Sequence, residues 1–446
     1  MPAVAVPAPL ARNAPLRRPA LAAGLMALLP LGDAIAQTRP AGGRAKPAAP
    51  LAVPAHHAAV RRALGVLRAD NAWTLDQQAS ICEVAAPPFK EAARAAEYRR
   101  RLEALGLRDV RTDAEGNVIA ERPGSAGGGA TVVVSAHLDT VFPEGTDVTV
   151  KRSGTQLTGP GIGDDCRGLA TLLAVARAFD QAKVATRAPV LFVGTVGEEG
   201  AGNLRGVRHL FEKELAGRTV SYFISVDGTG LGVTSRAVGS HRYRVTYAGP
   251  GGHSYGAFGM PNPVHALGRA IAKIADLQVP ESPRTTFSVG IVEGGTSVNA
   301  IAGGASMDVD LRSESAAALD SVDAALRRAL DAALQEERAR WPRSTAALSL
   351  KVDTIGIRPA GSQPDDAPIV RAAVDAGRAL GFTAPTSASS TDANVPMGLG
   401  IPSITLDAGG DGEGSHSLEE RYDDGAQGWL GPQWVALVVA TLAGVR

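Results

Sequence analysis

Two side chains suited to metal binding follow an apolar run of the sequence. His137 and Asp139 come directly after the largely β-branched run 131–136. Such a run predicts a strand buried on both faces, so His137 and Asp139 emerge where the strand ends, two residues apart and pointing the same way. A neutral imidazole can bind a metal while a nearby carboxylate holds its other N–H group. Taken alone, such a pair after a strand is more often part of a turn with local hydrogen bonds.

Further acidic and histidine side chains follow other predicted strands or lie in glycine-rich loops. They are Asp164, Asp165, Glu198, Glu199, Asp227 and His416. Parallel sheets bind ligands outside the carboxyl ends of their strands, so we expect these groups to converge there.

Carboxylates gathered in one crevice repel one another unless cations neutralise them. Two histidines and three or four carboxylates suit two divalent ions, with zinc favoured and cobalt or manganese as substitutes. Two metals about 3.5 Å apart can generate hydroxide near neutral pH and polarise a carbonyl.

The elements that must position these residues alternate between strand and helix. Helical periodicity in the segment 56–106 is followed by strands at 118–121, 131–136, 189–195 and 220–226 and by helices at 168–179 and 203–215. A helix at 366–380, a strand at 401–406 and a helix at 433–445 complete the pattern. This order predicts an α/β fold with a mostly parallel sheet flanked by helices.

A different order of elements interrupts that pattern. A strand at 240–248, a helix at 263–275, strands at 286–293 and 305–312, a helix at 316–338 and a strand at 346–353 follow one another. This is the order of a ferredoxin-like α+β unit. We therefore predict an inserted domain at 239–358, within a catalytic domain made of 55–238 and 359–446.

The N-terminal stretch has the features of an export signal. Arg12, Arg17 and Arg18 precede a small apolar run, and Ala34-Ile35-Ala36 forms a small-x-small cleavage site. We predict a signal peptide at 1–36, a flexible Ala/Pro-rich linker at 37–54, and a periplasmic or secreted protein, with the Sec and twin-arginine routes both open. In an oxidising compartment Cys82 and Cys166 could pair, but their positions in the sequence do not show whether they meet.

The overall charge argues against two classes of partner. Lys plus Arg and Asp plus Glu both number 45, so no net field would attract nucleic acid or an anionic membrane surface. After the predicted signal peptide, no stretch is long and apolar enough to suggest a membrane span.

Six motifs in order carry a family resemblance: HLDT, GPGIGDD, GEEG, SVDG, GPGGHS and GSHS. From about residue 60 to its end the chain resembles the co-catalytic zinc exopeptidase and amidohydrolase family that includes peptidase T, carboxypeptidase G, aminoacylase and carnosinase. The resemblance implies a zinc-exopeptidase-like catalytic domain with an inserted lid and dimerisation domain. It also implies two metal sites that share Asp164, one formed with His137 and Asp227 and the other with Glu199 and His416.

The same resemblance implies roles for other residues. Glu198 would be the general base that takes a proton from the bridging water and passes it to the leaving amine. Asp139 would orient His137, and His253 would reach the partner subunit's active site in a homodimer and stabilise the oxyanion. Asn299 and Arg312 would contact the substrate, Arg312 by gripping a carboxylate.

The chain also departs from the family pattern. Cys166 stands where the family often has Lys. Asp165 could be mistaken for the bridging residue, although the spacing from Gly159 and Gly161 favours Asp164. Asp227 is typical of the peptidase T and dipeptidase branches, whereas acylase and carboxypeptidase branches usually have Glu there. An Asp at position 227 therefore favours short peptides with a free amino end as substrates.

These observations predict an exported exopeptidase of aminopeptidase, tripeptidase or dipeptidase type that uses two metal ions. One alternative is an N-acyl-amino-acid amidohydrolase or carboxypeptidase of the same family. A second is a non-catalytic module that binds metal or peptide, which has no need for a base such as Glu198. Residue by residue, plainer readings also exist: solvated charges for Glu198 and Glu199, helix N-caps for Asp164 and Asp165, and a surface charge for Arg312.

Overall fold

The computed structural model describes residues 52–125 and 129–446. The predicted signal peptide and all but the last three residues of the predicted linker lie outside these ranges. Within the described ranges, no helix is both long and apolar enough to cross a membrane.

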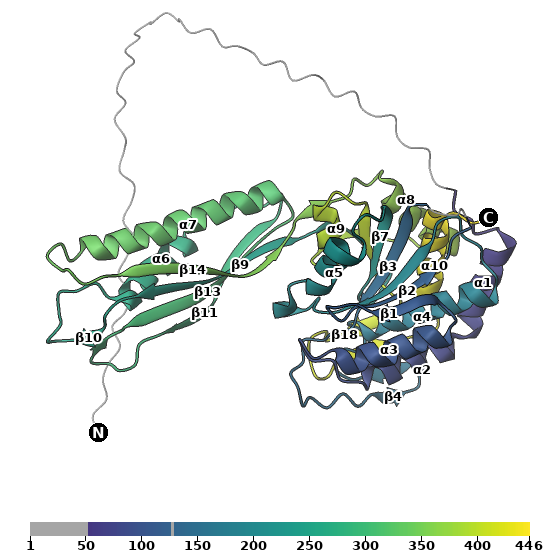
Figure 1. The fold of residues 1–446 in the computed structure, drawn as a ribbon, viewed down its shortest axis with the longest axis horizontal. Coiled ribbons are helices and arrows are strands. Elements are labelled where there is room, and N and C mark those ends of the chain that lie inside the picture. The colour runs from purple at the N-terminus through teal and green to yellow at the C-terminus, as the bar shows by residue number, and fades with distance from the viewer. Residues whose placement is uncertain (1–51, 126–128) are drawn as a thin grey trace, which may run out of the picture. The chain divides into compact units, whose positions relative to one another are not determined.

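A nine-stranded sheet forms the larger part of the protein (Figure 1). Its strand order is β1-β2-β6-β3-β7-β17-β8-β15, and β16 pairs with β8. The bounds are β1 (Arg108–Thr112), β2 (Val118–Arg122), β3 (Thr131–His137), β6 (Val190–Thr195), β7 (Val220–Val226), β8 (Val233–Ala237), β15 (Gly361–Ser362), β16 (Thr386–Ser389) and β17 (Ser403–Leu406). The central strands β6, β3, β7 and β17 run parallel, so the predicted α/β class with a mostly parallel sheet is confirmed.

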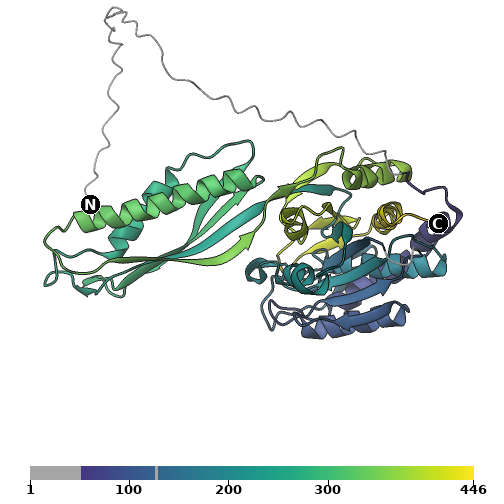
Figure 2. The ribbon, with the colours of Figure 1, turned by 45° about the horizontal axis from the view of Figure 1, so that its top comes forward.

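Helices cover both faces of this sheet (Figure 2). One face packs against α1 (Ala58–Ala69), α3 (Ala92–Ala104), α4 (Cys166–Gln181), α8 (Pro368–Leu380) and α10 (Leu430–Ala443), and the other against α5 (Arg205–His209) and α9 (Asn394–Gly398). Alternate residues of β3 reach the two cores: Val132 and Val134 join the first, and Val133 joins the second. This burial on both faces explains the continuous apolar run of β3.

Two predicted elements differ from the structure. The helix expected at 203–215 is broken, because Asn203 and Leu204 have positive φ angles and α5 gives way to a π-helical turn at Leu210–Glu214. The strand expected at 346–353 is instead β14 (Ser349–Arg358), whose pairing with β9 continues past a bulge between Thr354 and Gly356. Periodicity does not show such a bulge, because it shifts the alternation by one residue.

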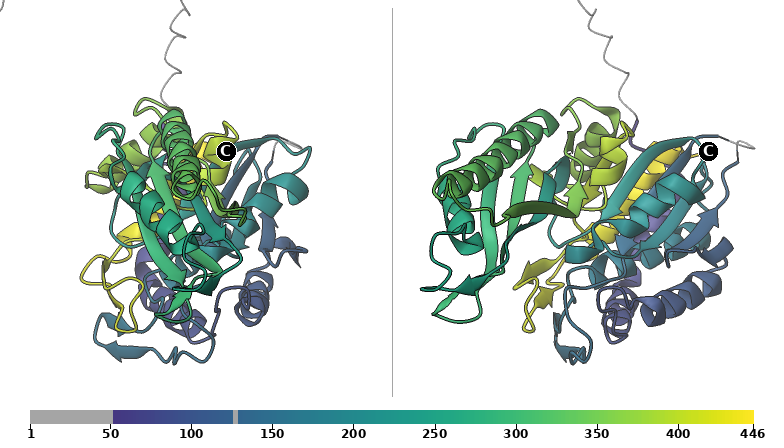
Figure 3. Two further views of the ribbon diagram at one scale, coloured as in Figure 1. Left: turned by 90° about the vertical axis from the view of Figure 1, so that its left-hand side faces the viewer. Right: turned by 60° about the vertical axis from the view of Figure 1, so that its left-hand side comes forward.

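A second, antiparallel sheet has its own core. Its strand order is β11-β13-β9-β14, with β9 (Gly239–Ala248), β11 (Thr285–Gly294) and β13 (Gly304–Ser313). The helices α6 (Pro263–Ala275) and α7 (Ala316–Ala339) pack on one face of it (Figure 3). The first strand begins at Gly239 and the last ends at Arg358, the positions where the sequence analysis places the domain boundaries. A two-stranded ribbon of β10 (Gly252–His253) and β12 (Ala300–Ile301) belongs to the same segment.

Short strands outside these sheets were not predicted. β4 (Lys151–Ser153), β5 (Gln156–Thr158), β18 (Asp411–Glu413) and β19 (Arg421–Asp423) form a four-stranded sheet. Three residues are too few for alternation to be recognised in the sequence.

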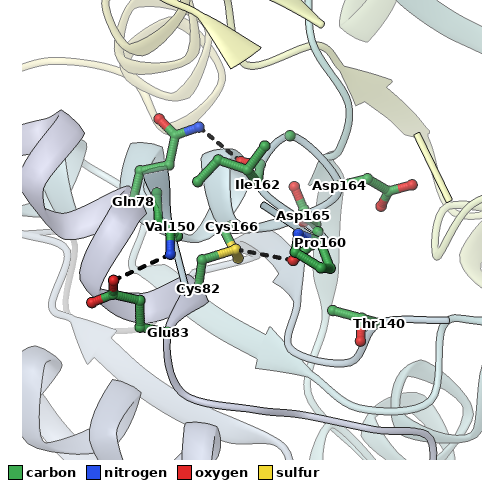
Figure 4. The surroundings of a disulfide bond; sticks show 12 residues. Gln78, Cys82, Glu83, Thr140, Val150, Pro160, Ile162, Asp164, Asp165 and Cys166 are labelled. Atoms are coloured by element: carbon green, nitrogen blue, oxygen red, sulfur yellow. Dashed lines mark hydrogen bonds between the residues drawn. A yellow bond between two sulfur atoms is a disulfide. The ribbon is translucent and has the colours of Figure 1, made fainter. Parts of the chain in front are cut away.

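A disulfide joins α2 (Asn71–Cys82) to the start of α4 (Figure 4). Cys82 and Cys166 are bonded, with their Cα atoms 5.6 Å apart. In the same contact, Gln78 Nε2 donates a hydrogen bond of 2.8 Å to the carbonyl of Ile162. The loop that carries Asp164 and Asp165 is therefore held against α2 on both sides of these residues, at Ile162 and at Cys166.

Candidate metal centre

The carboxyl ends of the parallel strands bring the predicted ligands together. β3 ends at His137, Asp227 follows β7, and Glu198 and Glu199 follow β6. His416 lies beyond β17, in the loop between β18 and β19, where its φ is 66°. Residues separated by almost 280 positions therefore share one edge of the sheet, as expected for a parallel α/β fold.

Asp164 stands between two histidines. Its Oδ1 lies 2.9 Å from His137 Nε2, and its Oδ2 lies 3.2 Å from His416 Nε2. His416 Nε2 is also 3.1 Å from Glu199 Oε1, and His137 Nε2 is 4.0 Å from Asp227 Oδ1. Two groups of three ligand atoms result, each with all atoms within 4.8 Å of one another: His137 with Asp164 and Asp227, and Asp164 with Glu199 and His416. These are the two sets that the family resemblance implies.

The electrostatics of the cluster fit bound cations. Burial, and after it the charge of Asp164, raises the pKa of Asp227 well above its usual range. Burial and the charges of Glu198 and Asp164 raise the pKa of Glu199 to about 7. Carboxylates crowded in this way hold protons unless positive charge lies between them. Imidazole nitrogens and carboxylate oxygens are the donors that zinc and similar divalent ions accept, so the residues present fit such a pair.

The neighbouring acids Asp164 and Asp165 have separate tasks. Asp165 is fully buried and turns into the protein, where its Oδ1 accepts from Gly168 N (3.0 Å) and its Oδ2 from His137 N (2.9 Å). The N-cap reading of the sequence therefore applies to Asp165, and Asp164 alone faces the histidines.

Asp139 makes contacts beyond the expected one with His137. The closest acceptor for His137 Nδ1 is the backbone carbonyl of Asp139 at 3.0 Å, whereas the carboxylate lies 3.7 Å away. That carboxylate accepts from the backbone N–H groups of Glu198 (3.0 Å) and Glu199 (2.8 Å). Buried N–H groups need acceptors, and the loop after β6 has these two to satisfy. Asp139 thus lies beside His137 and also positions the two glutamates.

Glu198 is buried beside the cluster and forms an ion pair that the sequence analysis missed. Its Oε1 lies 2.9 Å from Arg358 Nη1, and both side chains are almost fully buried. Burial raises the pKa of Glu198, while the charges of Arg358 and His137 oppose this rise. The arginine therefore fixes the direction of the carboxylate that the family resemblance names as the base.

Arg94 is a second residue that the sequence analysis missed. It is fully buried and donates to the carbonyls of Leu138 (2.9 Å), Val84 (2.8 Å) and Cys82 (3.2 Å). It thereby holds the backbone between His137 and Asp139. In the sequence it belongs to a helix rich in arginine, where nothing marks it as the buried one.

Glu420 holds the loop of the shared ligand. Its carboxylate accepts from the backbone N–H groups of Gly161 (2.9 Å), Gly163 (2.8 Å) and Asp164 (2.9 Å). A Cβ at Gly163 would lie 3.0 Å from Glu420 Oε1, so glycine at this position leaves room for the carboxylate to approach the backbone. No motif links Glu420 to this loop, and the contact arises only when β19 pairs with β5.

We expect Glu420→Gln to weaken metal binding by about 10- to 100-fold, the usual cost of losing an outer-shell partner. The amide N–H₂ group cannot accept, so part of the loop loses its acceptor and Asp164 is less well held. Titration of the metal-free protein with zinc against a chromophoric chelator measures the change. Glu419→Gln, which alters the exposed neighbouring residue, is the matched control and should behave as wild type. Equal affinities in the two variants would contradict this role.

A pocket of about 570 Å³ opens beside the metal ligands. Besides ligands and Glu198, its lining includes Arg242, Arg312, Arg358, Ser389, Thr405 and Asp407. The predicted substrate contact Arg312 thus faces the pocket, with its Nε 2.6 Å from Asp310 Oδ2.

His253 and Asn299 do not line this pocket. Both are exposed at the ribbon of β10 and β12, where the Asn299 carbonyl accepts from Ser254 N (2.9 Å). His253 Nδ1 accepts only weak hydrogen bonds of 3.3 Å from Tyr255 N and Gly256 N.

The parallel sheet, the shared carboxylate and the buried glutamate together define a metal-dependent hydrolase. Residues 133–428 match the peptidase family M20/M25/M40. The chain belongs to this family and is a hydrolase that acts on peptide or amide bonds. The family resemblance seen in the six motifs is confirmed.

The chain also resembles individual proteins, at low sequence identity. It is 24% identical over 295 residues to the uncharacterized protein YqjE of Bacillus subtilis, and the aligned region covers 63% of this chain and 73% of that protein. Crystal structures of the aminopeptidase PepT from Bacillus cereus (21% identity, TM-score 0.67) and of a tripeptidase, SAV1512, from Staphylococcus aureus (20% identity, TM-score 0.69) each cover 83% of this chain and 98% of their own. At these identities the structures show a shared fold.

Proposed function

We propose that this protein is an exported exopeptidase that hydrolyses a peptide bond at the end of short peptides, using two divalent metal ions, with zinc favoured. The observation that carries the proposal is the position of Asp164 in both donor groups, with Glu198 buried beside them. Asp227 and the names of two structural relatives, an aminopeptidase and a tripeptidase, favour substrates with a free amino end.

Each residue then has a defined task. When bound, the two metal ions supply Lewis acidity that polarises the scissile carbonyl and lowers the pKa of water. Glu198 accepts the proton of the attacking water and returns it to the leaving amine. Arg358 keeps Oε1 of Glu198 in place, and Asp139 fixes the backbone that carries the glutamate. Arg312 offers a guanidinium to the carboxylate of the substrate.

A substrate panel with metal analysis tests the proposal. The purified protein is stripped with a chelator, reloaded with zinc, cobalt or manganese, and assayed on di- and tripeptides with free amino ends and on N-acyl amino acids. We expect two metal ions per chain and turnover of the free peptides that disappears on chelation. Preferential cleavage of N-acyl amino acids would instead identify an amidohydrolase, and binding without turnover would identify a non-catalytic module.

Export is part of the proposal. The N-terminal sequence has the charge, apolar run and cleavage site of a signal peptide, and the bond between Cys82 and Cys166 suits an oxidising compartment. Cell fractionation with mass spectrometry of the N-terminus tests this, and we expect a secreted or periplasmic chain that begins at Gln37.

We also propose a homodimer formed through the inserted domain. β11 is an edge strand that exposes Ile291 and Val292, which are 50% and 56% accessible. Exposed apolar edges invite pairing with another chain. A partner would also give a task to His253, which stands apart from the pocket of its own chain.

We expect His253→Ala to lower kcat by about 100- to 1,000-fold, the usual effect of removing an oxyanion donor. Because the proposed role is in trans, mixing His253→Ala with Glu198→Gln chains should restore activity. Each mixed dimer then contains one complete site, giving about a quarter of wild-type activity after random exchange. Enzyme assays before and after subunit exchange measure this. No recovery despite mixed dimers seen by mass spectrometry, or full activity of a monomer in light scattering, would refute the cross-subunit role.

A further inference from the structure

Asp407 lines the pocket without any task in the metal centre. It follows β17 directly, and its Oδ2 accepts a hydrogen bond of 2.6 Å from Gly232 N. A methyl group added at Gly230 or Gly232 would lie 3.1 or 2.9 Å from the same oxygen. Glycine at both positions keeps that space free of a side chain, and Asp407 lines the pocket.

The other acids of the pocket all have positive partners. Asp164 and Glu199 face His416, and Glu198 pairs with Arg358. Asp227 Oδ1 lies 4.0 Å from His137 Nε2. Asp407 differs: across the part of the chain that the structure describes, no Lys, Arg or His lies within ion-pair distance of it. Its Oδ1 accepts no hydrogen bond from any described group. Burial raises the pKa of Asp407 to about 6, against the opposing effect of the hydrogen bond from Gly232.

A half-buried carboxylate with one unpartnered oxygen costs the folded protein free energy unless a ligand pairs with that oxygen. A purely structural acceptor for Gly232 N needs no charge, since Asn or Ser would serve. The negative charge and the open side facing the pocket both point to a cationic ligand. We propose that Asp407 binds the terminal ammonium group of the substrate and selects peptides with a free amino end.

The opposite charge is found elsewhere on the same pocket. Arg242 Nε and Arg312 Nε lie 3.2 and 2.6 Å from the two oxygens of Asp310, so two guanidinium groups share one carboxylate. One positive charge is left for a ligand. A pocket with one free negative and one free positive charge complements a zwitterion, and a short unmodified peptide is one. This inference rests on the proposed peptidase function and narrows it to a substrate class.

Asp407→Asn is the decisive variant, because the amide oxygen can still accept from Gly232 while the charge is removed. Steady-state kinetics compare a free dipeptide with its N-acetylated form, using wild type, Asp407→Asn, and Asp375→Asn as the control that removes a carboxylate from α8. We expect kcat/KM for the free peptide to fall by about 10- to 100-fold in Asp407→Asn, mainly through KM, as for a lost hydrogen bond to a charged group. The N-acetylated peptide should change less than about twofold, and the control should match wild type.

A second measurement needs no variant. An amino acid amide, which carries the ammonium but no carboxylate, should inhibit the wild-type enzyme competitively, whereas its N-acetylated form should inhibit at least about tenfold less well.

The possible outcomes separate the two hypotheses. If wild type prefers free peptides and Asp407→Asn retains the full preference, the inference about Asp407 is wrong and the peptidase function stands. An equal loss on both substrates, or equal inhibition by both amides, would also overturn it. If wild type prefers the N-acetylated substrates, the proposed function itself fails, and this inference fails with it.

Discussion

Replacing Glu198 by Gln should lower kcat by about 100- to 10,000-fold while the metal ions stay bound, because the amide cannot take up a proton. The substitution changes the local structure little. Arg358 can still donate to the remaining side-chain oxygen. The Glu198 backbone N–H group donates to Asp139 and its carbonyl accepts from Arg358, and neither contact uses the side chain of Glu198. The loss should therefore appear in kcat, with KM nearly unchanged.

Metal analysis by plasma mass spectrometry and single-turnover kinetics distinguish a lost base from a lost ligand. Glu198 also lies within reach of His137 and Glu199, so retention of both ions in Glu198→Gln is an essential control. Activity above about a tenth of wild type would remove Glu198 as the base, since proton transfer by a positioned side chain contributes at least 100-fold.

Replacing Asp164 by Asn should have an equally large effect through metal binding. Asp164 is the one residue shared by the two donor groups, so its charge would serve both ions of the proposed pair. We expect at most one tightly held ion per chain and a loss of activity of more than about 100-fold, since even outer-shell substitutions cost 10- to 100-fold. Calorimetric titration of the metal-free variant with zinc measures the stoichiometry.

Asp165→Asn is the matched control for this substitution. It removes an adjacent carboxylate that caps α4 and holds His137 N, so it should lower the thermal midpoint while two metal ions remain bound. If Asp165→Asn lost both ions and Asp164→Asn kept them, the assignment of the shared ligand would be reversed.

The parts of the fold that could be predicted have local causes. Helix α6 was placed at its observed bounds, Pro263–Ala275, because its apolar residues recur every three to four positions. Its start is explained by Asn262, which caps the first turn, and by Pro263 at the first position. The run of β3 and the residues after it were likewise readable because a strand buried on both faces has a distinct composition.

The supporting residues of the site could not be predicted for the opposite reason. Glu420 lies 256 positions from Asp164, and Arg358 lies 160 positions from Glu198. Such contacts depend on the three-dimensional packing of distant strands and leave no periodic pattern. The carboxylate of Asp139 lies beside His137, but its hydrogen bonds to the loop after β6 left no trace in the sequence. Asp407 belongs to none of the six motifs.

The bond between Cys82 and Cys166 turns the first part of the catalytic domain into a covalent ring. The two cysteines are 84 positions apart, and the ring contains both His137 and Asp164. In the chain-entropy account, closing a loop of this length limits the unfolded chain enough to favour the folded state by about 4–5 kcal/mol. The ring also keeps these two ligands tethered when the protein unfolds, so they stay at a high effective concentration for each other. In the oxidised chain, folding therefore begins with two of the three ligands of the proposed first metal site, His137 and Asp164, already inside one closed loop.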